Sequence, residues 1–535
     1  MSGHVFITCG DLTKLSCDAW LLPADAGCFV THHWWEGVSD DLRRQLAGLR
    51  YGDTPRPDNW GDRGARVIPL LGLQTELDQP CPYLVNVGGG LGSPIDWFME
   101  GARQFFQVVA EQHRGEGHHR RPRPLVALPL IGTGHGGAGH VKGEVVRALV
   151  DELYKAAEKY GFDVALVTDS VQPFVAAQNA RWQHLGSLQG TATCDLWPEL
   201  SDKLAASART LARRASTGGL VLFIGSGVSA DAGLPSWESL LNGLARDAGM
   251  DGREQDALAK LSILDRPRII ESRLAAKGRS IGKAVCDRLM EKCYSLMHSL
   301  LATLPISEVV TTNYDCLFED ASWAAGRATA VLPYQPVSGS SRWLLKMHGC
   351  VNHSEDIVLT REDYLRYPDR RAALAGIVQA LLITRHMLFI GFSLIDDNFN
   401  RIVDEVRKAI GGTDHQTLDG KPFGTAILLQ KDELLEELWR KDLNIVSMFD
   451  SAEVSIPEGA RRLEIFLDYL LAEASRATSP LLDEAFEGIL TDDERAVRDL
   501  LKSLMQGASK DLQRSPAWQP VAELIERLGG PSVQR

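Results

Sequence analysis

The sequence predicts an α/β protein with two domains in succession and a short helical tail, and three observations lead to this prediction. The chain has 535 residues, too many for a single hydrophobic core. Short apolar runs alternate with helical patterns over residues 1–185 and again over 205–475, as expected of sheets covered by helices. From residue 476 to 535 the apolar spacing is helical. Residues 186–204 mix small and polar residues and form the expected linker.

The strands of the first domain are expected where short apolar runs occur. These runs lie at 4–8, 19–23, 83–87, 125–131 and 163–168. The apolar spacing over 143–161 is that of an amphipathic helix. We therefore expect a sheet with helices packed against it in this part of the chain.

The second domain shows the same alternation and an additional helical segment. Its candidate strands lie at 219–225, 308–312, 343–348, 356–360, 386–391 and 424–430. Residues 250–304 read as a helix-rich insert between the first two of these strands. We expect a Rossmann-like sheet with a helical insert, followed by a helical tail from about residue 476 in which the helical spacing is seen at 481–506.

Composition excludes several functional classes. No apolar run approaches the roughly 20 residues of a membrane span, and the N-terminus lacks a signal-peptide pattern, so we expect a cytoplasmic protein. The net charge of −13 offers no general attraction for nucleic acid. The nine cysteines are scattered, without a C-x-x-C pair, which is typical of free thiols in a reducing compartment and argues against a zinc site.

A glycine-rich turn occurs at residues 223–237, FIGSGVSADAGLPSW. It connects a predicted buried strand to a predicted helix, and Gly225, Gly227 and Ala230 fit the pattern G-x-G-x-x-G/A. Small residues at this spacing let a pyrophosphate approach the backbone at a helix N-terminus. The acidic residue that a dehydrogenase carries about 20 residues later is missing, because residues 240–250 read as helix.

Three further polar motifs follow predicted strands in the second domain. They are VVTTNYD at 309–315, LLKMHG at 344–349 and LFIGFSL at 388–394. Open α/β sheets bind ligands at the carboxyl ends of their strands. Together with GSGVSADAGLPSW, these motifs resemble, in the same order, those of the SIR2 (sirtuin-like) family, and the resemblance covers about half of the chain.

This resemblance implies NAD+ as the substrate and a role for each motif. The catalytic residues it implies are Asn313 and His348. The residues expected to face the pyrophosphate and nearby ribose are Gly225, Ser226, Gly227 and Ser229. Asp315 is expected to accept a hydrogen bond from the nicotinamide carboxamide, and Gly391 and Ser393 to face the adenosine half.

Departures from the family narrow the expected reaction. Protein-deacylating sirtuins carry a four-cysteine zinc ribbon after the histidine, but only about ten residues separate Gly349 from Thr360. Their Phe-Arg pair is replaced by Ser236 and Trp237. The pattern instead resembles bacterial SIR2-like effectors of anti-phage defence that destroy NAD+, including the segment GFSLIDDNF at 391–399. The resemblance therefore implies an NAD+ glycohydrolase without zinc.

The expected chemistry needs few groups. Nicotinamide leaves NAD+ as a neutral molecule, so no strong general acid is required. The site must stabilise a ribosyl oxocarbenium-like transition state, position a water or ribose hydroxyl and exclude other water. Asn313 can hold that hydroxyl or water, and a neutral His348 can take a proton.

The first domain resembles macrodomains, which bind ADP-ribose. The resemblance lies in ITCGDLTKLSCDAWLLPAD at 7–25 and ALPLIGTGHGG at 127–137. It implies that Asp11 holds the adenine, and that a loop cradles the diphosphate through Gly132, Thr133, Gly134 and Gly136. Asp25 replaces the usual asparagine, and CFVTHHWWEGV at 28–38 replaces the usual glycine run. An ADP-ribosyl hydrolase is therefore not expected.

Three functions stay open from the sequence. The first is a regulated NAD+ glycohydrolase of anti-phage defence. The second is a SIR2-type protein deacylase or ADP-ribosyltransferase, and the third is a non-catalytic sensor of NAD+ or ADP-ribose. Because unregulated NAD+ loss kills a cell, we expect restraint by homo-oligomerisation, the first domain, or a phage-derived or operon-encoded protein trigger. The sequence does not distinguish linear from cyclic ADP-ribose as the product.

Overall fold

The structure is a computed structural model that describes residues 2–530 except 35–37, 62–63, 71–79, 89–92, 114, 116, 135, 188–195, 292, 339, 341, 412–421, 452, 477 and 479. The chain forms two compact units, one made of Met1–Ser201 with Leu471–Arg535 and the other of Asp202–Leu470. The C-terminal helices thus belong to the first unit. Residues 188–195 of the expected linker lie outside the described residues. The domain boundaries drawn from the sequence stay predictions.

The first unit is built on a six-stranded sheet of order β1-β6-β5-β2-β4-β3. Its strands are β1 (Val5–Cys9), β2 (Ala19–Ala24), β3 (Val67–Pro69), β4 (Cys81–Asn86), β5 (Leu125–Pro129) and β6 (Asp163–Thr168). The pairing is parallel except between β3 and β4. The five strands expected from apolar runs are confirmed. The sequence missed β3, which has only three residues.

Helices of the first unit come from both ends of the chain. They are α1 (Asp40–Tyr51), α2 (Ile95–Gln112), α3 (Lys142–Tyr160), α4 (Val171–Ser187), α16 (Asp492–Gly507), α17 (Lys510–Gln513) and α18 (Gln519–Arg527). The segment Glu484–Ile489 lies against α3 and α4, where Gln183 and Arg147 donate hydrogen bonds to its backbone carbonyls. The helix expected over 143–161 and the helical tail are both confirmed.

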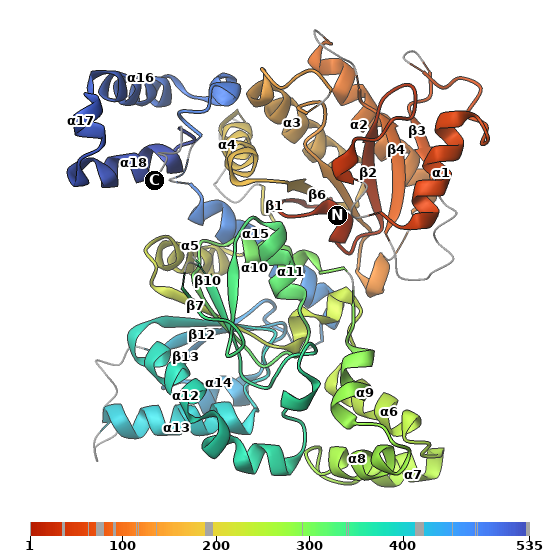
Figure 1. Cartoon of the computed structure of the whole chain (residues 1–535), viewed down its shortest axis with the longest axis vertical. Coiled ribbons are helices and arrows are strands. Elements are labelled where there is room, and N and C mark those ends of the chain that lie inside the picture. The colour runs from red at the N-terminus through yellow and green to blue at the C-terminus, as the bar shows by residue number, and fades with distance from the viewer. Residues whose placement is uncertain are drawn as a thin grey trace. The chain divides into compact units, whose positions relative to one another are not determined.

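The second unit contains a seven-stranded parallel sheet of order β13-β12-β11-β7-β8-β10-β9. Its strands are β7 (Leu220–Ile224), β8 (Glu308–Thr311), β9 (Thr329–Leu332), β10 (Arg342–Lys346), β11 (His386–Ile390), β12 (Gly424–Leu428) and β13 (Leu443–Ser447). β7 and β11 are buried along their whole length. The expected α/β class is therefore confirmed for this unit (Figure 1).

One strand expected in the second unit is wrong. Residues 356–360 form the end of a short helical turn and a loop. Thr360 is the N-cap of α12 (Arg361–Thr384), and it exchanges hydrogen bonds with Asp363 in a capping box. The apolar residues that suggested a strand, Val358 and Leu359, are buried in two different hydrophobic clusters. The edge strands β9 and β13 were missed because they are short and only partly buried.

The remaining helices of this unit cover the sheet and form the insert. They are α5 (Asp202–Ser216), α6 (Trp237–Asp247), α7 (Gly252–Ala259), α8 (Arg266–Ala276), α9 (Ile281–Arg288), α10 (Leu296–Thr303), α11 (Leu317–Ala324), α13 (Asp397–Gly411), α14 (Glu433–Trp439) and α15 (Ile456–Ala474), the last of which continues into the first unit. The expected helical insert is confirmed, and Figure 1 shows α6–α9 as a helical group beside the sheet. Tyr314 is buried in the hydrophobic cluster of this group.

The strand order determines where a ligand site can form in the second unit. From β7 the chain reaches β8 on one side, and it later places β11 on the other side. Such a reversal of strand order is a topological switch point, where loops diverge at the carboxyl ends of the strands and leave room for a ligand. Among the described residues, no helix is long and apolar enough to cross a membrane.

Candidate functional site

The predicted catalytic residues follow neighbouring parallel strands at equivalent positions. In the register of β8 and β10, Thr311 pairs with Lys346. Asn313 and His348 each come two residues after this pair. Both are almost fully buried, with 8% and 3% of their surface exposed. The sequence motifs at these strand ends therefore meet at the same edge of the sheet.

Two turns that contain glycine approach each other at the switch point. The backbone N–H of Gly227, after β7, donates to the carbonyl of Gly391, after β11, at 3.0 Å. A Cβ atom at Gly225 would lie 2.4 Å from that carbonyl oxygen. Gly391 has φ +63°, and a Cβ there would lie 2.6 Å from the backbone nitrogen of Val228. These glycines are required for the packing of the turns, independently of any ligand.

The side chain of Asn313 is held by the first of these turns. Its Nδ2 donates to the Gly225 carbonyl at 3.1 Å and to Ser229 Oγ at 3.2 Å. Its backbone N–H donates to Thr311 Oγ1 at 3.0 Å. Its Oδ1 is buried and has no hydrogen-bond partner among the described residues. A buried acceptor left unpaired costs about 1–3 kcal/mol, so this oxygen is a fixed acceptor for a hydroxyl or water.

Ser229 connects Asn313 to Asp315 in a buried polar network. Ser229 Oγ donates to Asp315 Oδ2 at 2.9 Å, and it lies 3.4 Å from His298 Nε2. The other carboxylate oxygen of Asp315 accepts from the backbone N–H of Leu317 at 3.1 Å, at the start of α11. Burial lowers the pKa of His298 to about 4, so its imidazole is neutral near pH 7. Asp315 therefore positions Ser229 and the start of α11.

His348 lies in a second polar group, formed by the segment after β11. Its Nε2 is 3.6 Å from Asp396 Oδ2 and 3.4 Å from Asn398 Nδ2. Tyr364 donates to the same Asp396 oxygen at 3.2 Å. Burial lowers the pKa of His348 below its usual 6.5, although the Asp396 carboxylate opposes that shift. A neutral imidazole that keeps a lone pair can act as a general base near pH 7.

The structure brings most of the predicted nucleotide-binding residues together, but in two groups. Asn313, Ser229 and Asp315 form one hydrogen-bonded group with the glycine turns, and His348 belongs to the group around Asp396. Among the described residues, no hydrogen bond joins Asn313 to His348. The predicted residues that lie exposed on the turns are Ser226, Gly227 and Ser393. Their side chains or backbone are accessible to a ligand.

Sequence reasoning missed several polar residues of this site. Asp396 and Asn398 lie within the segment 391–399 that carried the family resemblance, so the motif already contained the signal. His298 gave no such signal, because it lies on α10 far from any motif and reaches Ser229 only through the fold. Tyr364 lies on α12, after the segment wrongly expected to be a strand.

The predicted ADP-ribose residues of the first unit lie in loops after parallel strands. Asp11 follows β1 and caps a short helical turn, accepting from Thr13 N at 2.9 Å. The loop after β5 turns tightly at Gly132, with φ +74°, and a Cβ at Gly136 would lie 2.7 Å from the Gly132 Cα. Thr133 and Gly134 lie between them, and Gly134 has open space on its Cβ side.

Two further polar residues lie at the ends of strands in the first unit. Asp25, which replaces the asparagine of the macrodomain pattern, accepts from Phe29 N at 2.8 Å within its own loop. Residues 35–37 of the segment after it lie outside the described residues. Asn86, at the end of β4, is fully buried, and neither atom of its amide has a hydrogen-bond partner among the described residues. No sequence motif singles out Asn86, which lies inside an expected strand.

Comparison with known proteins agrees with the geometry of the second unit. Residues 307–448 match the family model for the SIR2-like domain, and these residues include the ends of β8, β10 and β11. The chain therefore contains a SIR2-like domain. The NAD(+) hydrolase ThsA of Enterococcus faecium is 30% identical over 197 residues, which is 36% of this chain and 40% of that protein. ThsA of Bacillus cereus is 29% identical over 194 residues, 35% of this chain and 40% of that protein.

A further relative and a solved structure also match parts of the chain. Defense-associated sirtuin 2 of Bacillus subtilis is 26% identical over 232 residues, 42% of this chain and 22% of that protein. The chain thus matches less than half the length of these curated relatives. A solved macrodomain of Oceanobacillus iheyensis with ADP has 15% identity and a TM-score of 0.27, covering 34% of this chain and 92% of that chain. The α/β description of the first unit rests on its own sheet topology.

We predict that Gly391→Ala destabilises the second unit. Alanine at φ +63° with its Cβ 2.6 Å from a backbone nitrogen strains the turn after β11. The free energy of unfolding, measured by urea titration, should fall by about 1–3 kcal/mol. Gly376→Ala is the matched control, because Gly376 lies on α12 with nothing within 4 Å of its Cβ position and should gain about 0.5–1 kcal/mol. Equal stabilities of the two variants would contradict the close approach of the turns.

A second prediction concerns the protonation of His348. NMR titration of labelled imidazoles should show His348 titrating below pH 6.5, because burial disfavours its charged form. Asp396→Asn removes the carboxylate that favours the imidazolium, so the pKa of His348 should fall further. The His348 signal is assigned by its loss in His348→Gln. A pKa of 6.5 or more in the wild type, or a rise in Asp396→Asn, would refute this description of the site.

Proposed function

We propose that this protein is an NAD+ glycohydrolase, which cleaves the bond between nicotinamide and ribose and releases nicotinamide and ADP-ribose. The observation that carries the proposal is the buried, unpaired Oδ1 of Asn313 at the switch point of the sheet. Its amide nitrogen is held by Gly225 and Ser229, so the oxygen keeps one orientation. A fixed acceptor at this place suits a ribose hydroxyl or an attacking water. The NAD(+) hydrolase relatives support the same substrate.

His348 supplies the proton acceptor of the proposed reaction. Its lowered pKa keeps the imidazole neutral near pH 7, where it can take a proton from water or a ribose hydroxyl. Nicotinamide leaves as a neutral molecule, so the site does not need a strong acid opposite His348. Charge develops instead on the ribose ring in an oxocarbenium-like transition state. The buried surroundings of Asn313 and His348 exclude bulk water from that ring.

The short segment after His348 favours hydrolysis over protein deacylation. Between Gly349 and Thr360 the chain makes a single turn and returns, with Val358 N–H donating to the His348 carbonyl at 2.9 Å. The segment therefore returns to the histidine within about ten residues. It is too short to contain the zinc ribbon that helps to shape a groove for an acyl-lysine peptide. The deacylase and transferase alternatives therefore rank below the glycohydrolase.

We propose that the enzyme is a cytoplasmic effector of anti-phage defence that depletes NAD+ and is held inactive until triggered. The relative described as a defense-associated sirtuin supports this setting. Restraint would come from homo-oligomerisation, from the first unit, or from a phage-derived or operon-encoded protein. Neither membrane nor nucleic acid is proposed as a partner, and NAD+ is the only nucleotide proposed for the second unit.

A second proposal is that the first unit binds ADP-ribose or a related nucleotide. Its support is Asn86, whose buried amide offers a donor and an acceptor without partners among the described residues. Asn86 pairs with Ala24 at the carboxyl ends of β4 and β2, the edge of the sheet that also carries the loops of Asp11 and Gly132. Parallel sheets bind ligands at this edge.

The glycohydrolase predicts that both strand-end residues are required for NAD+ cleavage. Asn313→Ala should lower kcat by about 10²–10³-fold, the usual effect of losing one positioned polar contact. His348→Ala should lower it by about 10²–10⁴-fold, as for a general base. Cleavage is measured on the full chain, with and without lysate of phage-infected cells, and the products are separated by chromatography.

Asn444→Ala is the control for that experiment, since Asn444 is exposed on the edge strand β13 and should leave the rate unchanged. An inactive wild type under every condition would refute the glycohydrolase, as would a fully active Asn313→Ala variant. Chromatographic separation of linear from cyclic ADP-ribose identifies the attacking group. Linear ADP-ribose indicates attack by water, and cyclic ADP-ribose indicates attack by a group of the substrate itself.

The nucleotide-binding proposal predicts an unusual pair of effects for Asn86→Leu. Leucine has a similar shape without polar atoms, so removal of the unpaired amide should raise the free energy of unfolding by about 1–3 kcal/mol. The same change should weaken ADP-ribose binding to the first unit at least about tenfold, as measured by calorimetry on the full chain. An Asn313→Ala background reduces binding at the second unit. Unchanged affinity in Asn86→Leu would refute this site.

A further inference from the structure

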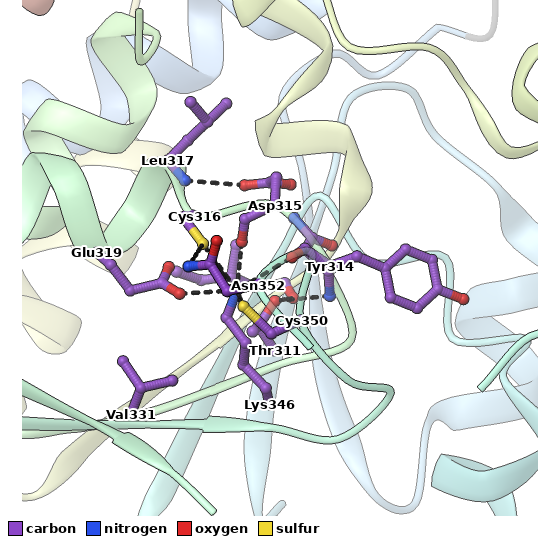
Figure 2. A network of polar contacts seen from close by, with 12 residues as sticks. Thr311, Tyr314, Asp315, Cys316, Leu317, Glu319, Val331, Lys346, Cys350 and Asn352 are labelled. Atoms are coloured by element: carbon purple, nitrogen blue, oxygen red, sulfur yellow. Dashed lines mark hydrogen bonds and ion pairs between the residues drawn. The ribbon is translucent and has the colours of Figure 1, made fainter. Parts of the chain in front are cut away.

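Two cysteine thiols lie close together beside the candidate site. Cys316 follows β8 and Cys350 follows β10, and their Sγ atoms are 3.5 Å apart (Figure 2). The backbones that carry them are joined, because Val351 N–H donates to the Tyr314 carbonyl at 2.8 Å. Cys316 is partly exposed and Cys350 is buried. The fold therefore aligns two thiols that are 34 positions apart in the sequence.

A buried lysine gives this pair an unusual charge. Lys346 Nζ, which has no exposed side-chain surface, lies 3.4 Å from Cys350 Sγ and 4.0 Å from Cys316 Sγ. The hydrogen bond with Cys316, together with the Lys346 ammonium, lowers the pKa of Cys350 below its usual value despite its burial. The pKa of Cys316 is raised, so Cys316 keeps its proton. A thiolate thus lies in contact with a thiol, which is the arrangement of a reactive pair.

The same residues are poorly suited to hold a metal ion. The ligand atoms of Cys316, Glu319 and Cys350 lie within 4.8 Å of one another, which a cation could in principle bridge. Lys346 already fills this position, because its Nζ is 2.7 Å from Glu319 Oε1 and Figure 2 shows it between the carboxylate and the sulfur atoms. A second cation would be repelled by the buried ammonium. The lysine favours thiolate chemistry over metal binding.

Three other cysteines lack this activation. Burial raises the pKa of Cys28, Cys81 and Cys286, so these thiols stay protonated and react slowly with oxidants. Cys286 is the best comparison, because it is buried in the same unit as the pair. Compared with these three thiols, we expect Cys350 to be the more reactive.

We propose that Cys316 and Cys350 form a reversible disulfide under oxidation by a hydroperoxide, and that this bond inactivates the adjacent site. The Cys350 thiolate attacks the peroxide and the O–O bond breaks, which leaves a sulfenic acid and releases water after proton uptake. The Cys316 sulfur then attacks the Cys350 sulfur, the S–O bond breaks, and the hydroxide leaves as water with the proton of Cys316. Two thiols and one hydrogen peroxide give one disulfide and two waters. A dithiol reverses the change.

Formation of the bond must draw together two side chains that lie next to residues of the candidate site. The sulfur atoms have to close from 3.5 Å to about 2.0 Å. Cys316 directly follows Asp315, which positions Ser229, and Cys350 lies two residues after His348. Lys346 also donates to the Tyr314 and Asp315 carbonyls, and it loses its thiolate partner when the disulfide forms. The loss of NAD+ cleavage on oxidation rests on the proposed function, whereas the disulfide itself does not.

The first test measures the bond without reference to activity. The reduced full chain is treated with hydrogen peroxide, its remaining thiols are alkylated, and its mass and peptides are determined. We expect the wild type and Cys286→Ser to lose two alkylatable thiols, to yield a linked peptide pair containing Cys316 and Cys350, and to recover both thiols with dithiothreitol. Cys316→Ser should stop at a dimedone-reactive sulfenic acid on Cys350. Unlinked thiols after treatment, or a stoichiometric metal that protects them in the purified protein, would overturn the proposal.

The second test measures the consequence for the site. Hydrogen exchange of backbone amides 312–317 should rise on oxidation in the wild type and stay constant in the double variant Cys316→Ser/Cys350→Ser. NAD+ cleavage by the wild type should fall at least tenfold and return with dithiothreitol, while that of the double variant should not respond. If the disulfide forms but hydrogen exchange and NAD+ cleavage both stay unchanged, the proposal that the disulfide inactivates the site is wrong. If the reduced protein never cleaves NAD+, the proposed function fails, and linkage with hydrogen exchange still decides the disulfide and its effect.

Discussion

The contact between the turn after β7 and the turn after β11 determines the rest of the candidate site. Gly227 donates to the Gly391 carbonyl at 3.0 Å, and neither Gly225 nor Gly391 has room for a Cβ atom. Because this contact fixes the Gly225 carbonyl, it also fixes the acceptor that holds the amide of Asn313. The glycines are therefore needed for the two turns to pack together. The same arrangement leaves Ser226 and Gly227 exposed, where a ligand can reach them.

The polar groups behind these turns are almost fully paired, which makes the exception informative. Ser229 contacts Asn313, Asp315 and His298, and Asp315 also holds the start of α11. Within this group the Asn313 Oδ1 is the buried atom without a partner among the described residues. Native structures rarely leave such an atom unpaired without a functional reason. The network positions one acceptor and leaves that acceptor to the substrate.

Much of the second unit could be predicted because its motifs directly follow buried strands. Periodicity located β7, β8, β10 and β11, and parallel strands bring their carboxyl ends to one edge. Periodicity failed at 356–360, where a helix cap and two core contacts produced the same apolar pattern as a strand. It also could not pair Cys316 with Cys350 or His298 with Ser229, because these contacts depend on loop paths that spacing does not encode.

The division of the chain has a consequence for synthesis. The first unit contains the segments Met1–Ser201 and Leu471–Arg535, so the second unit is an insertion within it. On the ribosome, residues of the second unit emerge and can fold before the last helices of the first unit exist, since domains generally fold in the order of translation. A nascent chain thus carries a complete second unit, which contains the SIR2-like domain, while the first unit is still incomplete. Any restraint that depends on the segment Leu471–Arg535 is established only after these residues have been synthesised.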